Sequence, residues 1–510
     1  MNRIVTLFAV IVMSALATHA APRKGRGCWR SVPKNHAATT RLQSRRINFD
    51  GGVQEGYTGQ KRGLVILAEF PDAKFKRAND REKYQRLLNE PGYTTGEGFR
   101  GSVADYFRDQ SVGQFLLTFD VAGPYTAAHE VAYYGQNSPK DDLDLRPEEL
   151  IKEMCIAADG EVDFADYDWD GDGEVDEVFV VYAGKGEADS YGANAADLIW
   201  PHMWTMEESP TGRFWLDGQC INVYACCNEV DYSGSITGIG TICHEFSHCL
   251  GLPDFYSIND SYVFGMGRFD LMDSGNYNGN GFCPPSYTAY EKMVCGWQQP
   301  IVLSDKDVTV SSIGPISEHG DTYIIYNDAN PDEFYTIENR QQTGWDKSYP
   351  RTGLVILHVD YDAEVWFNNL PNTIMTLEEA LSEDLTCGND HPRMTIFAAN
   401  DNDRSPRLYP YQQRDSLTAT STPAATLHTP NSEGSLLMQG AILNITQHTD
   451  GTMSFDYRAG QSSQADAVAT LRSDRKPATV YTLDGRAVRN ADATSLGHGI
   501  YIVDGRKVVR

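Results

Sequence analysis

The sequence predicts an α/β domain up to about residue 300 and a β-rich remainder after it. Before residue 300, short apolar runs typical of buried strands alternate with segments that have helical patterns and helix caps. After Pro300, short β-rich runs predominate, separated by turns rich in Asn, Asp, Gly and Pro. The chain has 510 residues, which suits about two to four domains.

Composition places the chain among globular proteins and excludes one class of partner. Hydrophobic residues make up 41% of the chain and charged residues 22%, as in globular rather than disordered proteins. The formal net charge is −27, and an acidic surface repels phosphates. We therefore expect no nucleic acid partner.

The N-terminus has the pattern of a signal peptide over residues 1–20. Arg3 gives a positive start, residues 4–16 are apolar but too few to span a bilayer, and small residues follow up to Ala21. A buried N-terminal helix is the alternative, which the polar and basic residues 22–30 disfavour. No later stretch is long and apolar enough for a transmembrane helix, so we expect an exported protein.

Strands and helices are expected to alternate in the α/β domain, at 61–300. Residues 21–60, which precede it, are basic and polar, like a pro-segment or an N-terminal arm. The expected strands are Gly63–Phe70, Gln114–Val121 and Val178–Tyr182, and the expected helices are Ser102–Asp109, Pro147–Ala158 and Ile239–Leu250.

The β-rich part is expected at 301–459, as one or more domains. Its expected strands are Val308–Ile313, Thr322–Tyr326, Glu333–Asn339 and Leu354–Asp360. A polar linker follows at 460–470. The tail at 471–510 contains two expected hairpins, VYTLDGRAV and GIYIVDGRKVV, each turning at Asp-Gly.

Ten cysteines are present, and in an exported protein some should be paired. The sequence does not give the connectivity; Cys220 with Cys226 or Cys227, and Cys283 with Cys295, are plausible local pairs. None of them has the paired spacing of a zinc ribbon.

The stretch HEFSHCLGLPDFY, at 244–256, predicts a metal site. On a helix, His244 and His248 lie on one face and can direct two imidazoles at one ion. Glu245 lies beside them, where it can take a proton from a metal-bound water. Two imidazoles, one further protein ligand and a water are a ligand set typical of catalytic zinc.

Asp254 is the expected third ligand. It stands ten residues after His244, where the related motif HExxHxxGxxH has a histidine. Gly251 lets the chain leave the helix sharply, so that Asp254 returns toward the metal. The alternative is a turn residue that caps the next segment of the chain. Cys243 and Cys249 flank the histidines but point away from the metal face.

The segment FDLMDSG, at 269–275, predicts a Met-turn with Met272 under the metal. Together with the long zinc motif, it favours a zincin fold of the metzincin-like type for the α/β domain. Tyr277 follows closely and is a candidate for stabilising an oxyanion; a solvated loop tyrosine is the alternative.

The acidic segment DWDGDGEVD, at 168–176, predicts a calcium site. Carboxylates at alternate positions with glycine at the sixth match the first half of an EF-hand loop. The expected ligands are Asp168, Asp170, Asp172, Glu174 (through its backbone carbonyl) and Asp176. Position twelve is Phe179 rather than glutamate, so other ligands must come from elsewhere, with Asp166 and Glu177 as candidates. A solvated acidic turn is the alternative.

These segments resemble the M6 metallopeptidases of the immune inhibitor A type. The resemblance lies in HEFSHCLGLPDFY, YDWDGDGEVDEVFVVYAGKGE, IWPH (199–202), SVADYFRDQSVGQF (102–115), YEKMVCGW (290–297) and GLVILHVD (353–360). It covers roughly residues 60–460 and implies a secreted zinc endopeptidase with structural calcium. By this resemblance His244, His248 and Asp254 bind zinc and Glu245 is the general base. His202 lies in a family-like motif without an assigned role.

The tail, TVYTLDGRAVRN and GHGIYIVDGRKVVR, is similar to C-terminal sorting domains of type IX secretion. This similarity implies an interaction with that secretion machinery and a place at the cell surface or in the medium. The alternative is a small β appendage of the preceding domain. Cys28 suggests a latency device that binds the zinc, although a disulfide partner or a free thiol is favoured.

The sequence thus predicts a secreted zinc endopeptidase that acts on proteins, host or mucosal glycoproteins among them. One alternative is a surface adhesin on a metalloprotease fold, which the intact Glu245 disfavours. Another is a zinc hydrolase of a non-protein substrate, which the long zinc motif and Met-turn disfavour.

Overall fold

The computed structural model describes residues 57–139, 143–192, 194–260, 263–383 and 385–460, and the backbone of the strands between residues 480 and 509. The predicted signal peptide, Cys28 and most of the predicted N-terminal arm and linker lie outside the described residues. The chain divides into two compact units, Met1–Ser463 and Gln464–Arg510.

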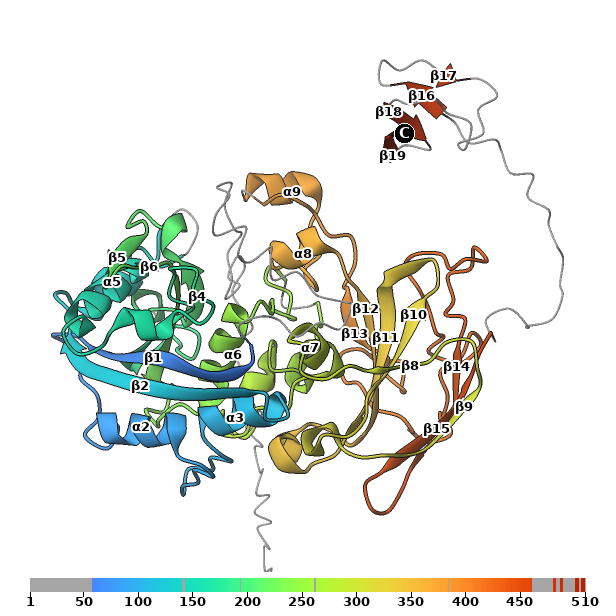
Figure 1. The fold of residues 1–510 in the computed structure, drawn as a ribbon, viewed down its shortest axis with the longest axis horizontal. Helices are drawn as coiled ribbons and strands as arrows, with labels where there is room; N and C mark the ends of the chain where they lie inside the picture. The colour runs from blue at the N-terminus through green and yellow to red at the C-terminus, as the bar shows by residue number, and fades with distance from the viewer. Residues whose placement is uncertain are drawn as a thin grey trace, which may run out of the picture. The chain divides into compact units, whose positions relative to one another are not determined.

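A five-stranded sheet forms the first part of the larger unit (Figure 1). Its strands, in spatial order, are β2 (Phe115–Thr126), β1 (Gly59–Glu69), β3 (Val178–Lys185), β7 (Val223–Val230) and β4 (His202–Thr205). The first four run parallel to one another, and β4 pairs antiparallel to β7 at the end of the sheet. Parallel strands are usually buried on both faces, which fits the apolar run of β1.

Helices cover both faces of this sheet. Alternate residues of β1 point to opposite sides, so Val65 and Leu67 join one hydrophobic cluster and Leu64 and Ile66 another. The first cluster includes side chains of α2 (Arg81–Asn89), α3 (Val103–Gln110), α6 (Ile239–Cys249) and α7 (Ala289–Val294). The second includes those of α4 (Val131–Gly135) and α5 (Pro147–Ala158). A small hairpin, β5 (Phe214–Leu216) and β6 (Gln219–Ile221), precedes β7.

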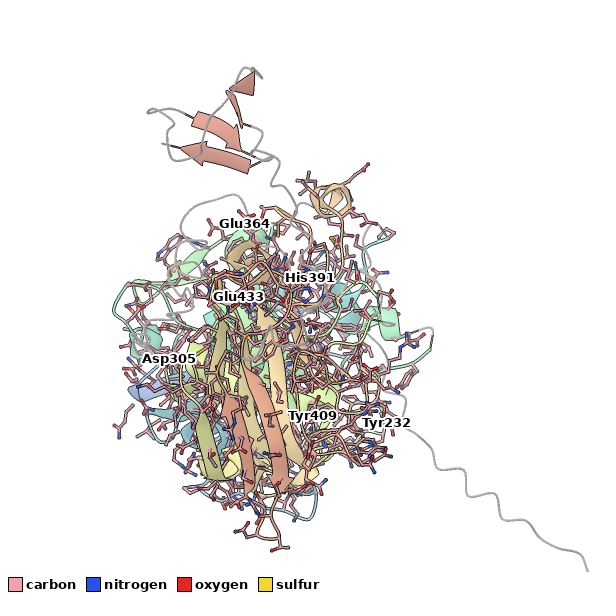
Figure 2. All side chains as sticks on the ribbon, turned by 90° about the vertical axis from the view of Figure 1, so that its right-hand side faces the viewer. Tyr232, Asp305, Glu364, His391, Tyr409 and Glu433 are labelled. Carbon is pink, nitrogen blue, oxygen red and sulfur yellow. The ribbon has the colours of Figure 1, made fainter. Side chains whose placement is uncertain are left out.

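Two further sheets form the β-rich part. One has the order β13 (Met394–Ile396), β12 (Gly353–Asp360), β11 (Asn330–Arg340), β10 (Tyr323–Asn327) and β8 (Ile301–Val302), and the other β14 (Ala441–Gln447), β15 (Met453–Arg458) and β9 (Val308–Ile313). Side chains from both sheets form a third hydrophobic cluster. Figure 2 views these strands from the side, with His391 near their upper end.

The hydrophobic packing continues from the α/β part into the β-rich part. On β12, Leu354 and Ile356 face the cluster between the two sheets, whereas Val355 and Leu357 join the cluster that contains α6 and α7. Between β12 and β13 the chain forms α8 (Ala363–Phe367) and α9 (Leu377–Ser382), which lie above the sheet in Figure 1. We call residues 361–393 the α8–α9 segment.

The smaller unit contains a four-stranded antiparallel sheet. The strands β16 (Val480–Thr482) and β17 (Ala487–Val488) pair with each other, as do β18 (Ile500–Val503) and β19 (Arg506–Val509), and β16 pairs with β18. Both expected hairpins therefore have their strand pairing.

The expected cysteine pairs are wrong. Every cysteine among the described residues is a free thiol. Cys226 and Cys227 are neighbours on β7 and point to opposite faces of the sheet, each into its own hydrophobic cluster. The Cys283 thiol donates to the carbonyl of Trp345, 3.2 Å away, instead of pairing with Cys295.

Among the helices that the structure describes, none is long and apolar enough to cross a membrane.

Candidate metal centre

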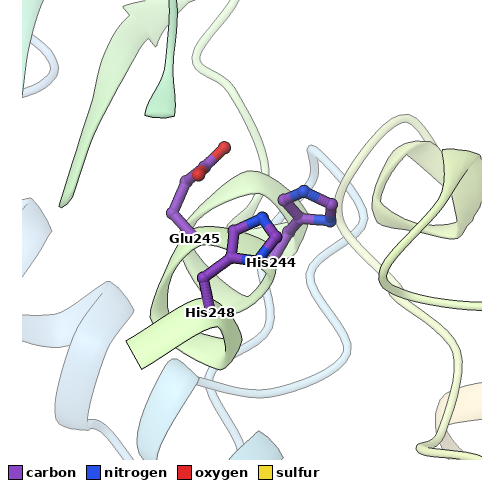
Figure 3. Close-up of side chains that lie close together, drawn as sticks. All are labelled: His244, Glu245 and His248. Carbon is purple, nitrogen blue, oxygen red and sulfur yellow. The ribbon is translucent and has the colours of Figure 1, made fainter. Parts of the chain in front are cut away.

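Helix α6 carries three ionisable side chains on one side. His244, Glu245 and His248 are at most 2% exposed, and one ligand atom from each lies within 4.8 Å of the others (Figure 3). The helix also approaches its neighbours closely. A Cβ on Gly240 would lie 1.8 Å from the carbonyl oxygen of Asn276, so glycine is required there.

The end of α6 brings Asp254 back to the histidines. Gly251 has φ +93°, and its N–H donates to the His248 carbonyl at 2.8 Å. The N–H of Leu252 donates to the Ser247 carbonyl at 3.2 Å, which completes a Schellman motif. The sharp exit expected from Gly251 is confirmed.

Three buried candidate ligand atoms converge beside α6. The Asp254 Oδ1 atom lies 3.3 Å from His244 Nε2 and 3.3 Å from His248 Nε2. A tetrahedral ion with metal–ligand bonds of about 2.0–2.1 Å has ligands about 3.3 Å apart. The donor set and its spacing therefore fit a zinc ion held by two imidazoles and one carboxylate oxygen.

Backbone carbonyls hold both imidazole rings in place. His244 Nδ1 lies 2.8 Å from the Leu271 carbonyl oxygen, and His248 Nδ1 lies 2.7 Å from that of Leu252. A ring whose Nδ1–H donates to a carbonyl leaves Nε2 as the acceptor or ligand atom. Both Nε2 atoms are thus oriented toward Asp254.

Electrostatics within this group favour one shared proton in the absence of metal. Burial would lower the pKa of His244, but the hydrogen bond to Asp254 and the charges of Glu245 and Asp254 raise it to about 9. In His248 burial dominates and the pKa is lowered. Burial would raise the pKa of Asp254, but the two imidazoles hold it well below its usual range. A cation can replace that proton.

Met272 lies in a turn that contacts both the Asp254 loop and His244. Its side chain is fully buried, and its carbonyl accepts from the N–H of Phe255, next to Asp254, at 2.8 Å. The preceding residue, Leu271, supplies the carbonyl that holds His244. Tyr277 ends the short helix η5 (Ser274–Tyr277), which packs against α6, and is half-buried. Its oxyanion role stays a prediction.

The acidic loop is folded around one of its own carboxylates. The backbone N–H groups of Gly171, Asp172 and Gly173 donate to the Asp168 carboxylate at 2.8–3.2 Å. Ligand atoms of Asp168, Asp170 and Asp176 lie within 4.8 Å of one another. The structure thus brings three of the four expected carboxylate ligands together.

The side chains of the other two expected ligand residues make further contacts, although the ligand atom expected of Glu174 is its backbone carbonyl. Asp172 Oδ1 accepts from the N–H of Glu174 at 2.9 Å, and Glu174 Oε1 accepts from Asn222 at 3.2 Å. Phe179, at position twelve, is buried in β3, as expected for a loop that runs into a strand.

Two further polar residues had no role assigned from sequence. His202 on β4 contacts the Trp200 carbonyl through Nδ1 (2.6 Å) and the Tyr224 hydroxyl through Nε2 (3.1 Å). Asn369 forms two hydrogen bonds with Asp254 from a position 115 residues later. The Asn-Asn-Leu-Pro turn signal around Asn369 predicts a loop but not its partner.

Comparisons with known proteins agree with this geometry. Residues 52–299 match the family described as immune inhibitor A peptidase M6, catalytic domain. Pre-pro-metalloprotease PrtV of Vibrio cholerae serotype O1 is 31% identical over 281 residues, covering 46% of this chain and 30% of the relative. Immune inhibitor A of Bacillus thuringiensis subsp. alesti is 26% identical over 311 residues, covering 51% of this chain and 44% of the relative.

This chain therefore spans less than half the length of these curated relatives. The family match includes both α6, with its two histidines, and the acidic loop. The comparisons thus indicate a metalloprotease catalytic domain of the M6 type within residues 52–299.

Proposed function

We propose that this chain is a secreted zinc endopeptidase that hydrolyses peptide bonds of extracellular proteins. The observation that carries the proposal is the 3.3 Å spacing of Asp254 Oδ1 from both histidine Nε2 atoms, beside a buried glutamate. The match of this segment to M6 catalytic domains supports the reaction class.

His244, His248 and Asp254 would hold the zinc, with Met272 in a Met-turn beneath it. When bound, zinc lowers the pKa of a bound water and polarises the scissile carbonyl. Glu245 takes the proton of the attacking water and passes it to the leaving amine. The hydrogen bonds from both Nδ1 atoms to backbone carbonyls keep the imidazoles aimed at the site throughout.

The position of β4 favours an extended peptide as substrate. Among the described strands of that sheet, it lies at the end, pairs with β7 alone and packs against α6. An extended chain can add to such an edge through main-chain hydrogen bonds. That mode of binding suits an endopeptidase better than a hydrolase of small amides or glycans.

Calcium in the acidic loop and export through the tail complete the proposal. Three clustered carboxylates and a loop folded around Asp168 support a calcium site. The signal peptide pattern and the sorting-type tail support secretion to the surface or the medium, by type IX secretion. Host or mucosal glycoproteins are then accessible substrates.

Casein cleavage by the purified mature protein tests the proposal, beside Glu245→Ala, with zinc measured in both. Removing a general base should slow cleavage about 10²–10⁴-fold while zinc is retained. Glu148→Gln is the matched control, because Glu148 is also a buried helical glutamate but lies on α5. It should leave cleavage unchanged.

Equal cleavage by the native protein and Glu245→Ala would contradict the assigned base. Bound zinc without cleavage by either protein would instead favour a binding role or a substrate of another class, and a mucin panel would separate these.

A further inference from the structure

The α8–α9 segment lies directly against the loop that carries Asp254. Asn372 Nδ2 donates to the Phe255 carbonyl at 2.8 Å, and Thr373 Oγ1 accepts from the N–H of Ile258 at 3.0 Å. Residues 369–374 and 254–259 therefore run side by side. The α8–α9 segment lies beyond residues 52–299, the part that matches the M6 catalytic domain.

Asn369 contacts Asp254, the residue proposed as the third metal ligand. Its Nδ2 donates to Asp254 Oδ2 at 2.7 Å, and its Oδ1 accepts from the Asp254 backbone N–H at 2.7 Å. One amide thus holds both the backbone and one carboxylate oxygen of the same residue. The other oxygen, Oδ1, is the atom that faces the two histidines.

Asparagine suits this position for two physical reasons. Asn369 has φ +57°, a left-handed conformation that asparagine adopts more readily than most residues. It is also fully buried, where a side chain must satisfy its donors and its acceptor. Its backbone is fixed as well, because the Asn369 N–H donates to the Trp366 carbonyl, in α8, at 3.1 Å.

We infer that Asn369 is a positioning residue for the third metal ligand. By occupying Oδ2, it would leave Oδ1 as the one carboxylate oxygen that Asp254 offers to a zinc ion. The α8–α9 segment is therefore part of the metal centre. The inference rests on the proposed function, since it requires that His244, His248 and Asp254 bind zinc.

Zinc affinity measured by chelator competition tests the inference without relying on activity. Asn369→Gly removes the amide and tolerates the positive φ. Loss of such a contact to a ligand should weaken zinc binding about 10–100-fold. Thr373→Val is the matched control, because it removes a hydrogen bond from the same segment to the same loop, but none to the carboxylate. It should keep native zinc affinity.

Cobalt substitution gives a second readout that a merely structural role would not change. The native cobalt protein should show the intense visible absorption of a four-coordinate ion. Asn369→Gly should lose intensity, because Asp254 is then free to bind through both oxygens. Unfolding temperatures of the metal-free proteins separate a change in metal coordination from general destabilisation. If the variant does not fold, the spectrum of the native cobalt protein still tests the inference.

Native zinc affinity and an unchanged cobalt spectrum in Asn369→Gly would overturn the inference, as would a five-coordinate spectrum of the native cobalt protein. In either case zinc binding that depends on His248 would leave the proposed function standing. If the native protein takes up neither metal, the proposed function and the inference fail together.

Discussion

Glu291, on α7, shows how burial decides the proton state of a single residue near the metal centre. It is fully buried and interacts with Asp270, whose Oδ1 accepts from the Met272 N–H at 2.7 Å. Burial raises the pKa of Glu291 to about 7. Burial also raises the pKa of Asp270 strongly, and repulsion from an ionised Glu291 raises it further. The pair therefore retains a proton that free carboxyls would lose.

Glu291→Gln should make the protein less sensitive to rising pH. The folded pKa of about 7 lies above the ordinary value of 4.5, so only the unfolded chain releases this proton between those pH values. Stability is therefore lost as pH rises from 4.5 through 7, and glutamine, which resembles the protonated acid, avoids that loss. Relative to native protein, the variant should gain on the order of 1–3 kcal/mol between about pH 5 and about pH 8.

Denaturant unfolding of both proteins at both pH values measures the difference in their stability. Any pH dependence of metal binding is common to both proteins and cancels in the comparison. Glu379→Gln is the matched control, because Glu379 occupies the same capping-box position on α9 but is exposed. A stability difference between Glu291→Gln and native protein that stays constant with pH would contradict the assignment.

At the scale of elements, the acidic loop is connected to α6 through an aromatic contact. Trp169, within the loop, packs against Phe246 on α6, with ring centroids 6.0 Å apart. Its indole N–H donates to the Arg62 carbonyl, on β1, at 2.7 Å. An ordered loop therefore supports α6 through this ring contact, and loss of a bound ion should loosen both the loop and the helix.

Calcium added to protein dialysed free of it, at saturating zinc, should raise the unfolding temperature. A ligand that binds only the folded state at a hundred times its Kd stabilises that state by about 2.7 kcal/mol. Asp168→Asn should abolish this response, because Asp168 belongs to the clustered carboxylates. Asp159→Asn removes an equal charge from an exposed site at the end of α5 and should respond like the native protein. Equal responses of all three proteins would argue against a site in this loop.

Across the whole molecule, local sequence patterns predicted the local structure well, whereas long-range contacts could not be predicted from the sequence. His244, His248, Gly251 and Asp254 lie within eleven residues, so helix geometry and one glycine turn suffice to place them together. The strand β7 was not predicted, since its sequence VYACCNEV includes Asn228 and Glu229 and so lacks the continuous apolar run of β1 and β3, and its cysteines suggested a disulfide instead. Asn369 could not be predicted, because its partner lies 115 residues away and depends on the tertiary fold.

The division into two compact units predicts that the tail can be removed without harm to the metal centre. All of the residues proposed to bind metal or to catalyse lie in Met1–Ser463, whereas the expected sorting hairpins lie in Gln464–Arg510. A chain ending at Ser463 should therefore keep native zinc content and casein cleavage.

In a host with type IX secretion, the same truncation should abolish release of the protein, which immunoblots of medium and cell fractions would measure. Substituting only the tail's two Asp-Gly turns provides the matched control for chain length. Unimpaired release of the truncated protein would show that the tail is a β appendage rather than a sorting signal, while loss of zinc would show that the metal centre needs the tail.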